Sequence, residues 1–280
     1  MNDIPSPLIS AKELQTLINS EQIIILDATM PPVGFTFKED KFLCIPGAQF
    51  FDIEEKASDL TSNLPHSLPT PETFTRYVQS LGINTDAHVV VYDRYGIYSA
   101  PRAWWLFKTM GFENVQVLNG GLVAWREAGF ATDEKYECDS PPGNFVARLQ
   151  TQWVVDKQTV LNHSNHTTAN IVDARSSGRF YGTEPEPRTG LRGGHIPNST
   201  NIPFATLVDE GRYLGPKQLK SIFNQAGVEA ALPLIFSCGS GVTACVVLLA
   251  AQLCGYSKLS VYDGSWSEWG GDNDLPVSKT

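Results

Sequence analysis

The sequence predicts an α/β protein made of two homologous domains, each a parallel sheet with helices on both faces. Its 280 residues are enough for two domains of ordinary size. Short apolar runs alternate with amphipathic helical segments, a pattern typical of parallel sheets covered on both faces. The same order of motifs also occurs twice along the chain. With 42% apolar and 18% charged residues, each half can bury a core.

The repeat is clearest where an apolar run meets a polar turn and then a helical pattern. Residues 89–105 read VVVYDRYGIYSAPRAWW, and residues 234–249 read LIFSCGSGVTACVVLL. Each half then closes on a tryptophan at nearly the same spacing, 32 residues from Asp93 to Trp125 and 31 from Cys238 to Trp269. The equivalent positions Asp93 and Cys238 therefore differ in chemistry.

The apolar runs and the helix boundaries place the predicted elements. Buried strands are expected at residues 22–27, 87–92, 114–118, 169–173, 232–237 and 259–263. Helix starts are marked by Ser10 with Glu13, by Thr70 with Pro71 and by Gly215 with Pro216, and helix ends by Gly82 and Gly227. Prolines without a period indicate a linker, so we predict domains at 1–135 and 151–280 joined by residues 136–150.

Charge and cysteine usage exclude several classes of protein. A net charge of −9 and a pI of about 5.0 argue against nucleic-acid or anionic-membrane partners. The N-terminus lacks the pattern of a signal peptide, and the longest apolar run, residues 245–254, is too short to span a bilayer. Five cysteines without close pairing suit a reducing compartment, with neither a disulfide framework nor a metal site. We expect a cytoplasmic protein without metal or cofactor.

Cys238 carries the most specific chemical signal. It ends a buried run and precedes Gly239, Ser240 and Gly241, after which a helical pattern begins. Such a loop turns backbone N–H groups and a helix N-terminus toward one point, which favours a thiolate and stabilises a persulfide formed on it. The same loop could bind phosphate, and a buried cysteine at a strand end can also be purely structural.

The combined motifs resemble those of the 3-mercaptopyruvate sulfurtransferases of the tandem-domain rhodanese superfamily. The resemblance rests on CGSGVT at 238–243, DGSWSEW at 263–269 and GRFYGTEPEPR at 178–188, and it extends over nearly the whole chain. It implies that the C-terminal domain is catalytic and the N-terminal domain a degenerate copy. It also implies sulfur transfer from 3-mercaptopyruvate through a Cys238 persulfide, with release of pyruvate. Thioredoxin or a low-molecular-weight thiol is the implied acceptor, with cyanide as a laboratory one.

The resemblance also assigns substrate contacts. Arg179 and Arg188 match residues that bind substrate, and guanidinium groups suit the carboxylate of a small keto acid. Gly239, Gly241, Val242 and Thr243 form the rest of the loop around the thiol. Tyr98 of the first half is an expected further contact, or else a packing residue. The alternative for the arginines is surface pairing with Glu184 and Glu186.

A proton relay is a further implication of the family. Ser240 matches its serine and His66 its histidine, while Glu54 and Asp59 are both open as the acid. His66 lies in a proline-rich loop and could instead be an ordinary surface residue. Arg175 and His195 are expected to serve structure, Cys245 and Cys254 to lie in the core, and Cys138 to be exposed in the linker.

Three other functions stay open. Rhodaneses that use thiosulfate resemble CRKGVT, whose cationic side chains suit a dianion, whereas Gly239 and Ser240 are neutral. Thiosulfate transfer is therefore expected to be the weaker activity. A cysteine-dependent phosphatase would need an arginine six positions after Cys238, where Ala244 stands. A non-catalytic rhodanese module is the third alternative, and the presence of Cys238, Arg179 and Arg188 argues against it.

Overall fold

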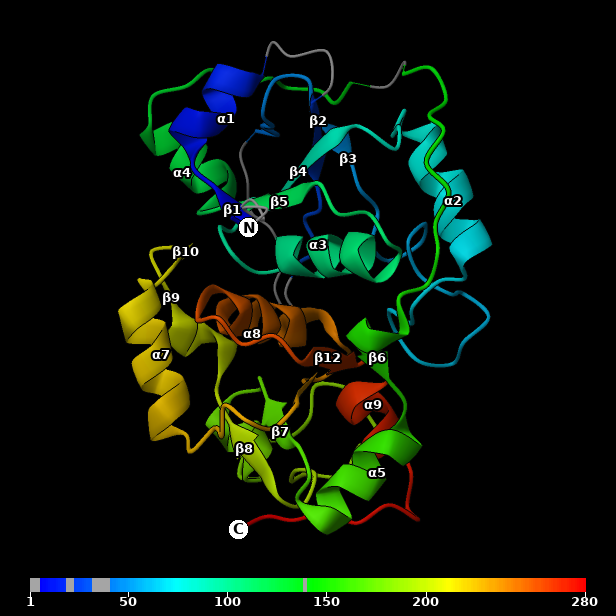
Figure 1. The fold of residues 1–280 in the computed structure, drawn as a ribbon, viewed down its shortest axis with the longest axis vertical. Coiled ribbons are helices and arrows are strands. Elements are labelled where there is room, and N and C mark those ends of the chain that lie inside the picture. The colour runs from blue at the N-terminus through cyan, green and yellow to red at the C-terminus, as the bar shows by residue number, and fades with distance from the viewer. Residues whose placement is uncertain (1–5, 19–22, 32–40, 138–139) are drawn as a thin grey trace. The chain divides into compact units, whose positions relative to one another are not determined.

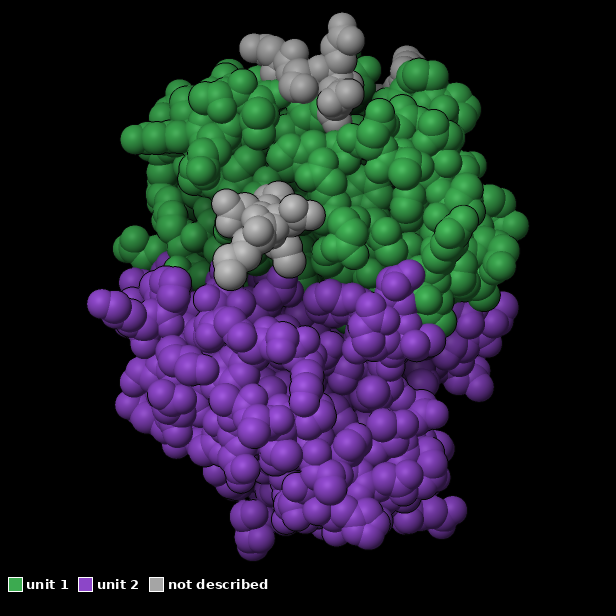
Figure 2. Space-filling model, viewed as in Figure 1, with its two compact units in different colours: residues 1–58, 69–149, 210–213 green, residues 59–68, 150–209, 214–280 purple. Residues whose placement is uncertain are grey.

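The computed structural model describes residues 6–18, 23–31, 41–137 and 140–280. The chain forms two compact units (Figure 2). Unit 1 comprises residues 1–58, 69–149 and 210–213, and unit 2 comprises residues 59–68, 150–209 and 214–280. Residues 59–68 are therefore part of unit 2, although the predicted domain bounds place them in the first half. The bounds 1–135, 136–150 and 151–280 stay a prediction, and Cys138 lies outside the described residues.

Unit 1 contains a five-stranded, fully parallel sheet. Its strand order is β1-β5-β4-β2-β3, with Ile25 of β2 opposite Val90 of β4 and Val117 of β5 opposite Val91. The strands are β1 (Leu8–Ile9), β2 (Ile23–Asp27), β3 (Gln49–Phe50), β4 (His88–Tyr92) and β5 (Val115–Leu118). The central strand β4 is buried along Val89–Tyr92, which explains its unbroken apolar run.

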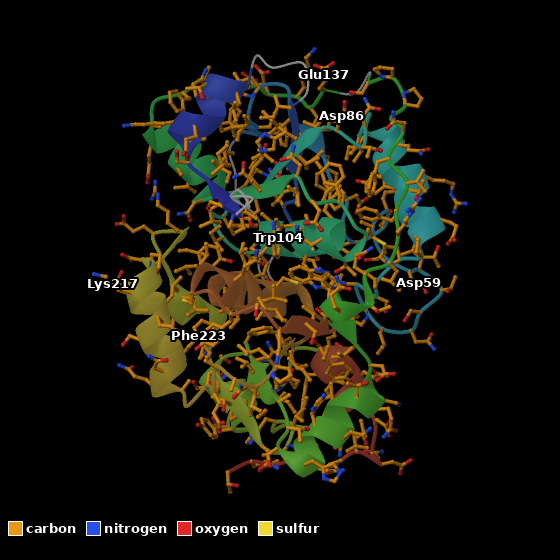
Figure 3. All side chains as sticks on the ribbon, in the orientation of Figure 1. Asp59, Asp86, Trp104, Glu137, Lys217 and Phe223 are labelled. Atoms are coloured by element: carbon orange, nitrogen blue, oxygen red, sulfur yellow. The ribbon has the colours of Figure 1, made fainter. Side chains whose placement is uncertain are left out.

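Helices cover both faces of this sheet (Figure 1). On one face, α1 (Ala11–Leu17) and α4 (Gly121–Glu127) pack against Ile25 and Val90 through Leu14 and Trp125. On the other face lie α2 (Pro71–Ser80) and α3 (Ala100–Thr109), whose residues Phe74 and Phe107 meet edge to face. All ten residues of α3 are buried, among them Trp104, which is labelled in Figure 3.

Unit 2 repeats the topology of unit 1. Its parallel sheet has the order β6-β12-β11-β7-β8, so that β11 occupies the position of β4 and β7 that of β2. The strands are β6 (Val154–Val155), β7 (Asn170–Asp173), β8 (Ser199–Asn201), β11 (Leu234–Ser237) and β12 (Leu259–Tyr262). This equivalence places Cys238, after β11, at the position that Asp93, after β4, holds in unit 1.

The helices of unit 2 also lie on both faces. Helices α5 (Lys157–His166) and α9 (Ser265–Trp269) pack on Ile235 through Val160 and Trp266. Helix α8 (Val242–Leu253) contacts β11 and β12, and α7 (Pro216–Gln225) packs against α8 (Figure 1). Phe223 of α7, labelled in Figure 3, is fully buried. The remaining elements are short: η1 (Thr151–Trp153), α6 (Ser177–Phe180), η2 (Phe204–Leu207), β9 (Val208–Asp209) and, in unit 1, β10 (Arg212–Tyr213).

These observations confirm the predicted fold class. All six predicted strands are present, with bounds that differ from the prediction by one or two residues. Residue 22, the predicted start of the first of them, lies outside the described residues. The sequence pattern missed β1, β3, β6 and β8, because two or three residues show no period. In the described ranges, no helix is both long and apolar enough to cross a membrane.

The predicted helix boundaries follow from local chemistry. Ser10 forms a capping box with Glu13, and the Thr70 side chain accepts a hydrogen bond from the Thr73 N–H. Gly82 and Gly227 follow the ends of α2 and α7, each at φ +75°, a left-handed conformation that glycine adopts without strain.

These two glycines predict a graded response to alanine. A Cβ at Gly227 would meet nothing within 4 Å, whereas at Gly82 it would lie 2.9 Å from Ser140 Cβ and 3.1 Å from Pro141 O. We expect Gly227→Ala to cost about 1 kcal/mol for the left-handed backbone, and Gly82→Ala about 2–4 kcal/mol because overpacking is added. Urea unfolding of both variants measures the difference, and equal costs would contradict this account.

Candidate active site

Cys238 lies at the junction of β11 and α8. It follows Ser237, the last residue of the central strand, and Gly241 at φ +79° forms the N-cap of α8. The first N–H groups of a helix have no intrahelical partner, and the helix dipole adds positive potential at the same end. Cys238 is only 2% exposed, so protein groups rather than bulk water surround it. The helix N-terminus is the feature of this position that favours a negative group.

Helix α9 fixes the first half of this loop. The Cys238 carbonyl accepts a hydrogen bond from Trp266 N–H (3.0 Å), and the Gly239 carbonyl accepts from Ser267 N–H (2.9 Å) and Ser267 Oγ (2.6 Å). Cys238 N–H in turn donates to Ser265 Oγ at 3.2 Å. The DGSWSEW motif is recognisable in the sequence, but it predicts no role for Ser265 or Ser267. Their contacts show that they hold the loop backbone.

In unit 1, the equivalent loop after β4 donates hydrogen bonds to the carboxylate of Asp93. The fully buried Asp93 carboxylate accepts hydrogen bonds from the backbone N–H of Tyr95 (3.1 Å) and from those of Tyr98, Ser99 and Ala100 (2.9 Å each). Burial raises the pKa of Asp93 to about 6, while these four donors act to lower it. In this fold, the loop after the central strand surrounds a negative group with main-chain donors.

Both predicted substrate arginines lie beside the Cys238 loop. A Cβ placed on Gly239 would be 3.0 Å from Arg179 Nη2 and 3.7 Å from Arg188 Nη1. Arg188 Nη2 also approaches Ser240 Oγ at 3.5 Å, the outer limit for a hydrogen bond. Two cationic groups therefore converge on the loop that carries the thiol, the arrangement expected for binding a small carboxylate next to it.

The alternative of surface pairing holds only in part. Arg179 does pair with Glu186, at 2.6 Å, but the Glu186 side chain is 2% exposed and does not lie at the surface. Glu184 accepts a hydrogen bond from Ser176 Oγ instead. Arg188 pairs with no carboxylate among the residues that the structure describes.

The segment 59–68 brings His66 to Ser240. His66 Nδ1 lies 3.0 Å from Ser240 Oγ, and the Leu68 N–H donates to Asp263 Oδ2 at 2.7 Å, which anchors the end of the segment. His66 has φ +59°, a left-handed conformation that is strained outside glycine. It is thus a half-buried residue in contact with the loop, not an isolated surface histidine.

Neither candidate acid is assigned by these contacts. Asp59, labelled in Figure 3, begins the same segment, and its Oδ1 accepts hydrogen bonds from Thr61 N–H (2.9 Å) and Thr61 Oγ1 (2.7 Å). These two bonds lower the pKa of Asp59. Glu54 belongs to unit 1, as does Tyr98. The roles of all three residues stay predictions.

The residues expected to serve structure are buried, with one exception. Arg175 and His195 are 2% and 3% exposed, and burial lowers the pKa of His195. Cys245 lies in the core of α8, but Cys254 was wrongly placed there, because α8 ends at Leu253 and Cys254 is half-exposed at its C-cap. Among the described residues, no cluster of His, Cys, Asp and Glu side chains could hold a metal ion.

Comparison with known proteins identifies the family. The profile of the rhodanese-like domain matches residues 10–128 and again residues 156–272. The chain is 45% identical over 276 residues to the 3-mercaptopyruvate sulfurtransferase of Escherichia coli strain K12, covering 96% of each. It is 42% identical over 273 residues to the thiosulfate sulfurtransferase of Cricetulus griseus, covering 94% of this chain and 91% of that one.

A solved structure agrees with these matches. SseA from Escherichia coli, a 3-mercaptopyruvate sulfotransferase of the rhodanese fold, superposes with a TM-score of 0.84 at 42% identity, covering 93% of this chain and 99% of that one. The chain therefore belongs to the rhodanese-like family, with two copies of the domain. Its relatives within that family are sulfurtransferases, which confirms the predicted family and class of enzyme.

The Asp93 loop predicts a specific pH dependence. We expect Asp93→Asn to destabilise the protein, because an amide NH₂ would face backbone donors. The folded-state pKa of about 6 lies above the ordinary 3.8, so the folded protein binds a proton first as pH falls. Wild type should therefore gain stability relative to the variant between about pH 7 and about pH 5. Urea unfolding of both proteins across this pH range measures the difference in their free energies of unfolding. If that difference shrinks as the pH falls, the hydrogen bonds from the backbone N–H groups affect the Asp93 pKa more than burial does.

Proposed function

We propose that the protein transfers sulfur from 3-mercaptopyruvate to a thiol acceptor through a persulfide on Cys238. One observation supports this above the others: the Cys238 thiol lies at a helix N-terminus beside the same loop that Arg179 and Arg188 approach. A thiolate nucleophile and two carboxylate-binding groups are what this reaction needs. The named activities of the similar 3-mercaptopyruvate sulfurtransferases support the same donor.

The proposed first half-reaction is a displacement at sulfur. Arg179 and Arg188 bind the substrate carboxylate, and the Cys238 thiolate attacks the substrate sulfur. The new S–S bond forms as the C–S bond breaks, and its electron pair stays on carbon as the enolate of pyruvate. In the second half-reaction, an acceptor thiolate attacks the outer sulfur of the persulfide, and Cys238 leaves as a thiolate. No metal or cofactor takes part.

Ser240 and His66 complete the proposal. Enolate protonation requires a donor near the broken C–S bond, and Ser240 Oγ stands two residues from the nucleophile. His66 Nδ1, at 3.0 Å, can return a proton to that oxygen. The backbone of Gly239, Gly241, Val242 and Thr243 is assigned to stabilising the charged sulfur. Tyr98 stays a proposed substrate contact from unit 1.

Overall similarity does not choose the donor, because a thiosulfate sulfurtransferase is 42% identical to this chain. The choice rests on the loop. Gly239 and Ser240 are neutral where thiosulfate-using rhodaneses resemble CRKGVT, so a monocarboxylate is preferred over a dianion. Thioredoxin or a low-molecular-weight thiol is the proposed sulfur acceptor, and the cytoplasm is the proposed location.

A cysteine-dependent phosphatase is disfavoured. Such an enzyme would need an arginine six positions after Cys238, where the fully buried Ala244 stands.

Replacing the nucleophile tests the proposal directly. We expect Cys238→Ser to abolish pyruvate release from 3-mercaptopyruvate while leaving the thermal unfolding curve intact, because a serine hydroxyl cannot form a persulfide. Intact mass spectrometry should show one added sulfur atom on wild type after donor treatment and none on the variant. Cys245→Ser is the matched control and should keep the added sulfur. Pyruvate turnover by a folded Cys238→Ser variant would refute the mechanism.

Changing the loop should change the donor. We expect the double variant Gly239→Arg, Ser240→Lys to raise kcat/KM for thiosulfate relative to 3-mercaptopyruvate by about tenfold or more, because each added cation attracts a dianion more strongly. A side chain at Gly239 also meets Arg179 Nη2 at 3.0 Å, which should weaken keto-acid binding. Steady-state assays with both donors and cyanide as acceptor measure the ratio. An unchanged ratio would show that the loop does not select the donor.

A further inference from the structure

A buried chain of alternating charges runs to Arg179. The Arg175 guanidinium binds the Asp173 carboxylate through Nε (3.1 and 3.0 Å) and Nη2 (2.6 Å), and its Nη1 donates to Glu186 Oε1 at 2.7 Å. Glu186 in turn accepts from Arg179 Nε (3.2 Å to each oxygen) and from Arg179 Nη2 (2.6 Å). The side chains of Arg175, Asp173 and Glu186 are 0%, 2% and 2% exposed, so this chain of charges lies beneath the surface.

The inner end of this chain is rigidly held. Arg175 Nη2 also donates to the Gly194 carbonyl at 2.8 Å, and its guanidinium stacks over the Trp266 ring at 4.2 Å. The ion pairs with Asp173 and Glu186 raise the pKa of Arg175 against the opposing effect of burial. Glu186 is therefore fixed from one side by a cation that cannot rotate away, and it presents its second oxygen toward Arg179.

Glu186 occupies one edge of the Arg179 guanidinium. With one N–H each from Nε and Nη2 bound to the carboxylate, the second N–H of Nη2 and both N–H groups of Nη1 are left for substrate, and they make no hydrogen bond to a described residue. Nη2 is also the Arg179 atom nearest Gly239, and the side chain as a whole is 22% exposed. Arg188, with no carboxylate partner among the described residues, has no comparable support.

We propose that Glu186 is a positioning residue for the donor-binding step: it fixes Arg179 so that the guanidinium meets the substrate carboxylate beside Cys238 without prior ordering. A flexible arginine loses side-chain entropy on binding a ligand, and a preformed bidentate pair removes that cost. Among the described residues, the side-chain partners of Glu186 are Arg175 and Arg179, so its proposed effect on the donor passes through Arg179. This inference rests on the proposed function, since it concerns the same site and the same donor.

The variant Glu186→Gln distinguishes two possible roles of Glu186: orienting the Arg179 guanidinium, or only neutralising its positive charge. A glutamine cannot accept from two guanidinium groups without turning its NH₂ toward one of them, so Arg179 is released. If Glu186 positions Arg179, KM for 3-mercaptopyruvate rises about tenfold while kcat changes less than about threefold. If Glu186 only cancels charge, its removal leaves a more positive site and KM falls. A lower or unchanged KM overturns the proposal.

Three comparisons control the experiment. Glu184→Gln removes a neighbouring carboxylate that bonds Ser176 Oγ and should leave KM unchanged. KM for cyanide as acceptor should be unchanged in Glu186→Gln, because the acceptor does not need Arg179. In an Arg179→Lys background, Glu186→Gln should raise KM for the donor less than about twofold, since the group it positions is gone. An additive effect in that cycle would also overturn the proposal.

Loss of folding is covered by a second variant. Glu186→Asp keeps the buried negative charge between two arginines but shortens its reach, so it should fold and show an intermediate KM. Thermal unfolding of every variant identifies those that fail to fold, and in that case Glu186→Asp alone decides: a wild-type KM overturns the inference. The proposed function fails separately, if wild type releases no pyruvate from 3-mercaptopyruvate.

Discussion

The interaction on which this protein depends is the one between backbone N–H groups and a single negative group at the carboxyl end of a central parallel strand. A parallel sheet brings its loops and helix N-termini to that edge, where donors without intrahelical partners accumulate. At Asp93, the interaction is observed directly, with four N–H donors on one carboxylate. At Cys238, the same position in the repeat carries a thiol, with Gly241 turning the loop into α8. The backbone of the fold thus supplies N–H donors at this edge of the sheet, whichever side chain follows the central strand.

Beside the Cys238 loop, three buried charged side chains compensate one another. An isolated ion in the interior would cost several kcal/mol, yet Asp173, Arg175 and Glu186 are all nearly inaccessible. Each meets an opposite charge, and the planar guanidinium of Arg175 adds a stacked contact with Trp266. Such a network holds its members in one arrangement, because displacing any of them leaves another buried charge unpaired. Rigidity of this kind is useful at a binding site, where a displaced guanidinium would miss a small ligand.

The sequence allowed the fold class and the internal repeat to be predicted, because long buried strands and capped helices leave strong local signals. The equivalence of Asp93 and Cys238 emerged from the matching order of motifs and from their spacing, and the helix boundaries at Ser10, Thr70 and Gly215 from capping chemistry. Strands of two or three residues could not be predicted, since their pairing is decided by neighbours distant in sequence. Cys254 was misplaced for a related reason: periodicity shows that a helix is apolar but not where its last turn leaves the core.

The site was predictable in its residue types but not in its contacts. Motifs singled out Cys238, Ser240 and both arginines, yet no pattern relates residue 66 to residue 240 across 174 positions. Glu186 was considered only as a surface partner, because an acidic residue between prolines has no sequence feature that signals burial. Its contacts with Arg175 and Arg179 exist only once the fold has formed. Interactions of this kind, between residues before, within and after the short helix α6, are decided by tertiary packing.

The difference between the two copies follows from the same electrostatics. In unit 1, the Asp93 carboxylate accepts the hydrogen bonds of four backbone N–H groups, so these donors are already occupied by a group of the chain itself. In the proposed mechanism, the thiol of Cys238 in unit 2 exchanges a sulfur atom, and its loop stabilises the charged sulfur that results. The Asp93 carboxylate is a fixed part of its own loop, whereas a sulfur atom in the equivalent position is the proposed nucleophile. The residue at the end of the central strand is thus one difference between the two copies, and the approach of Arg179 and Arg188 to the Cys238 loop is another.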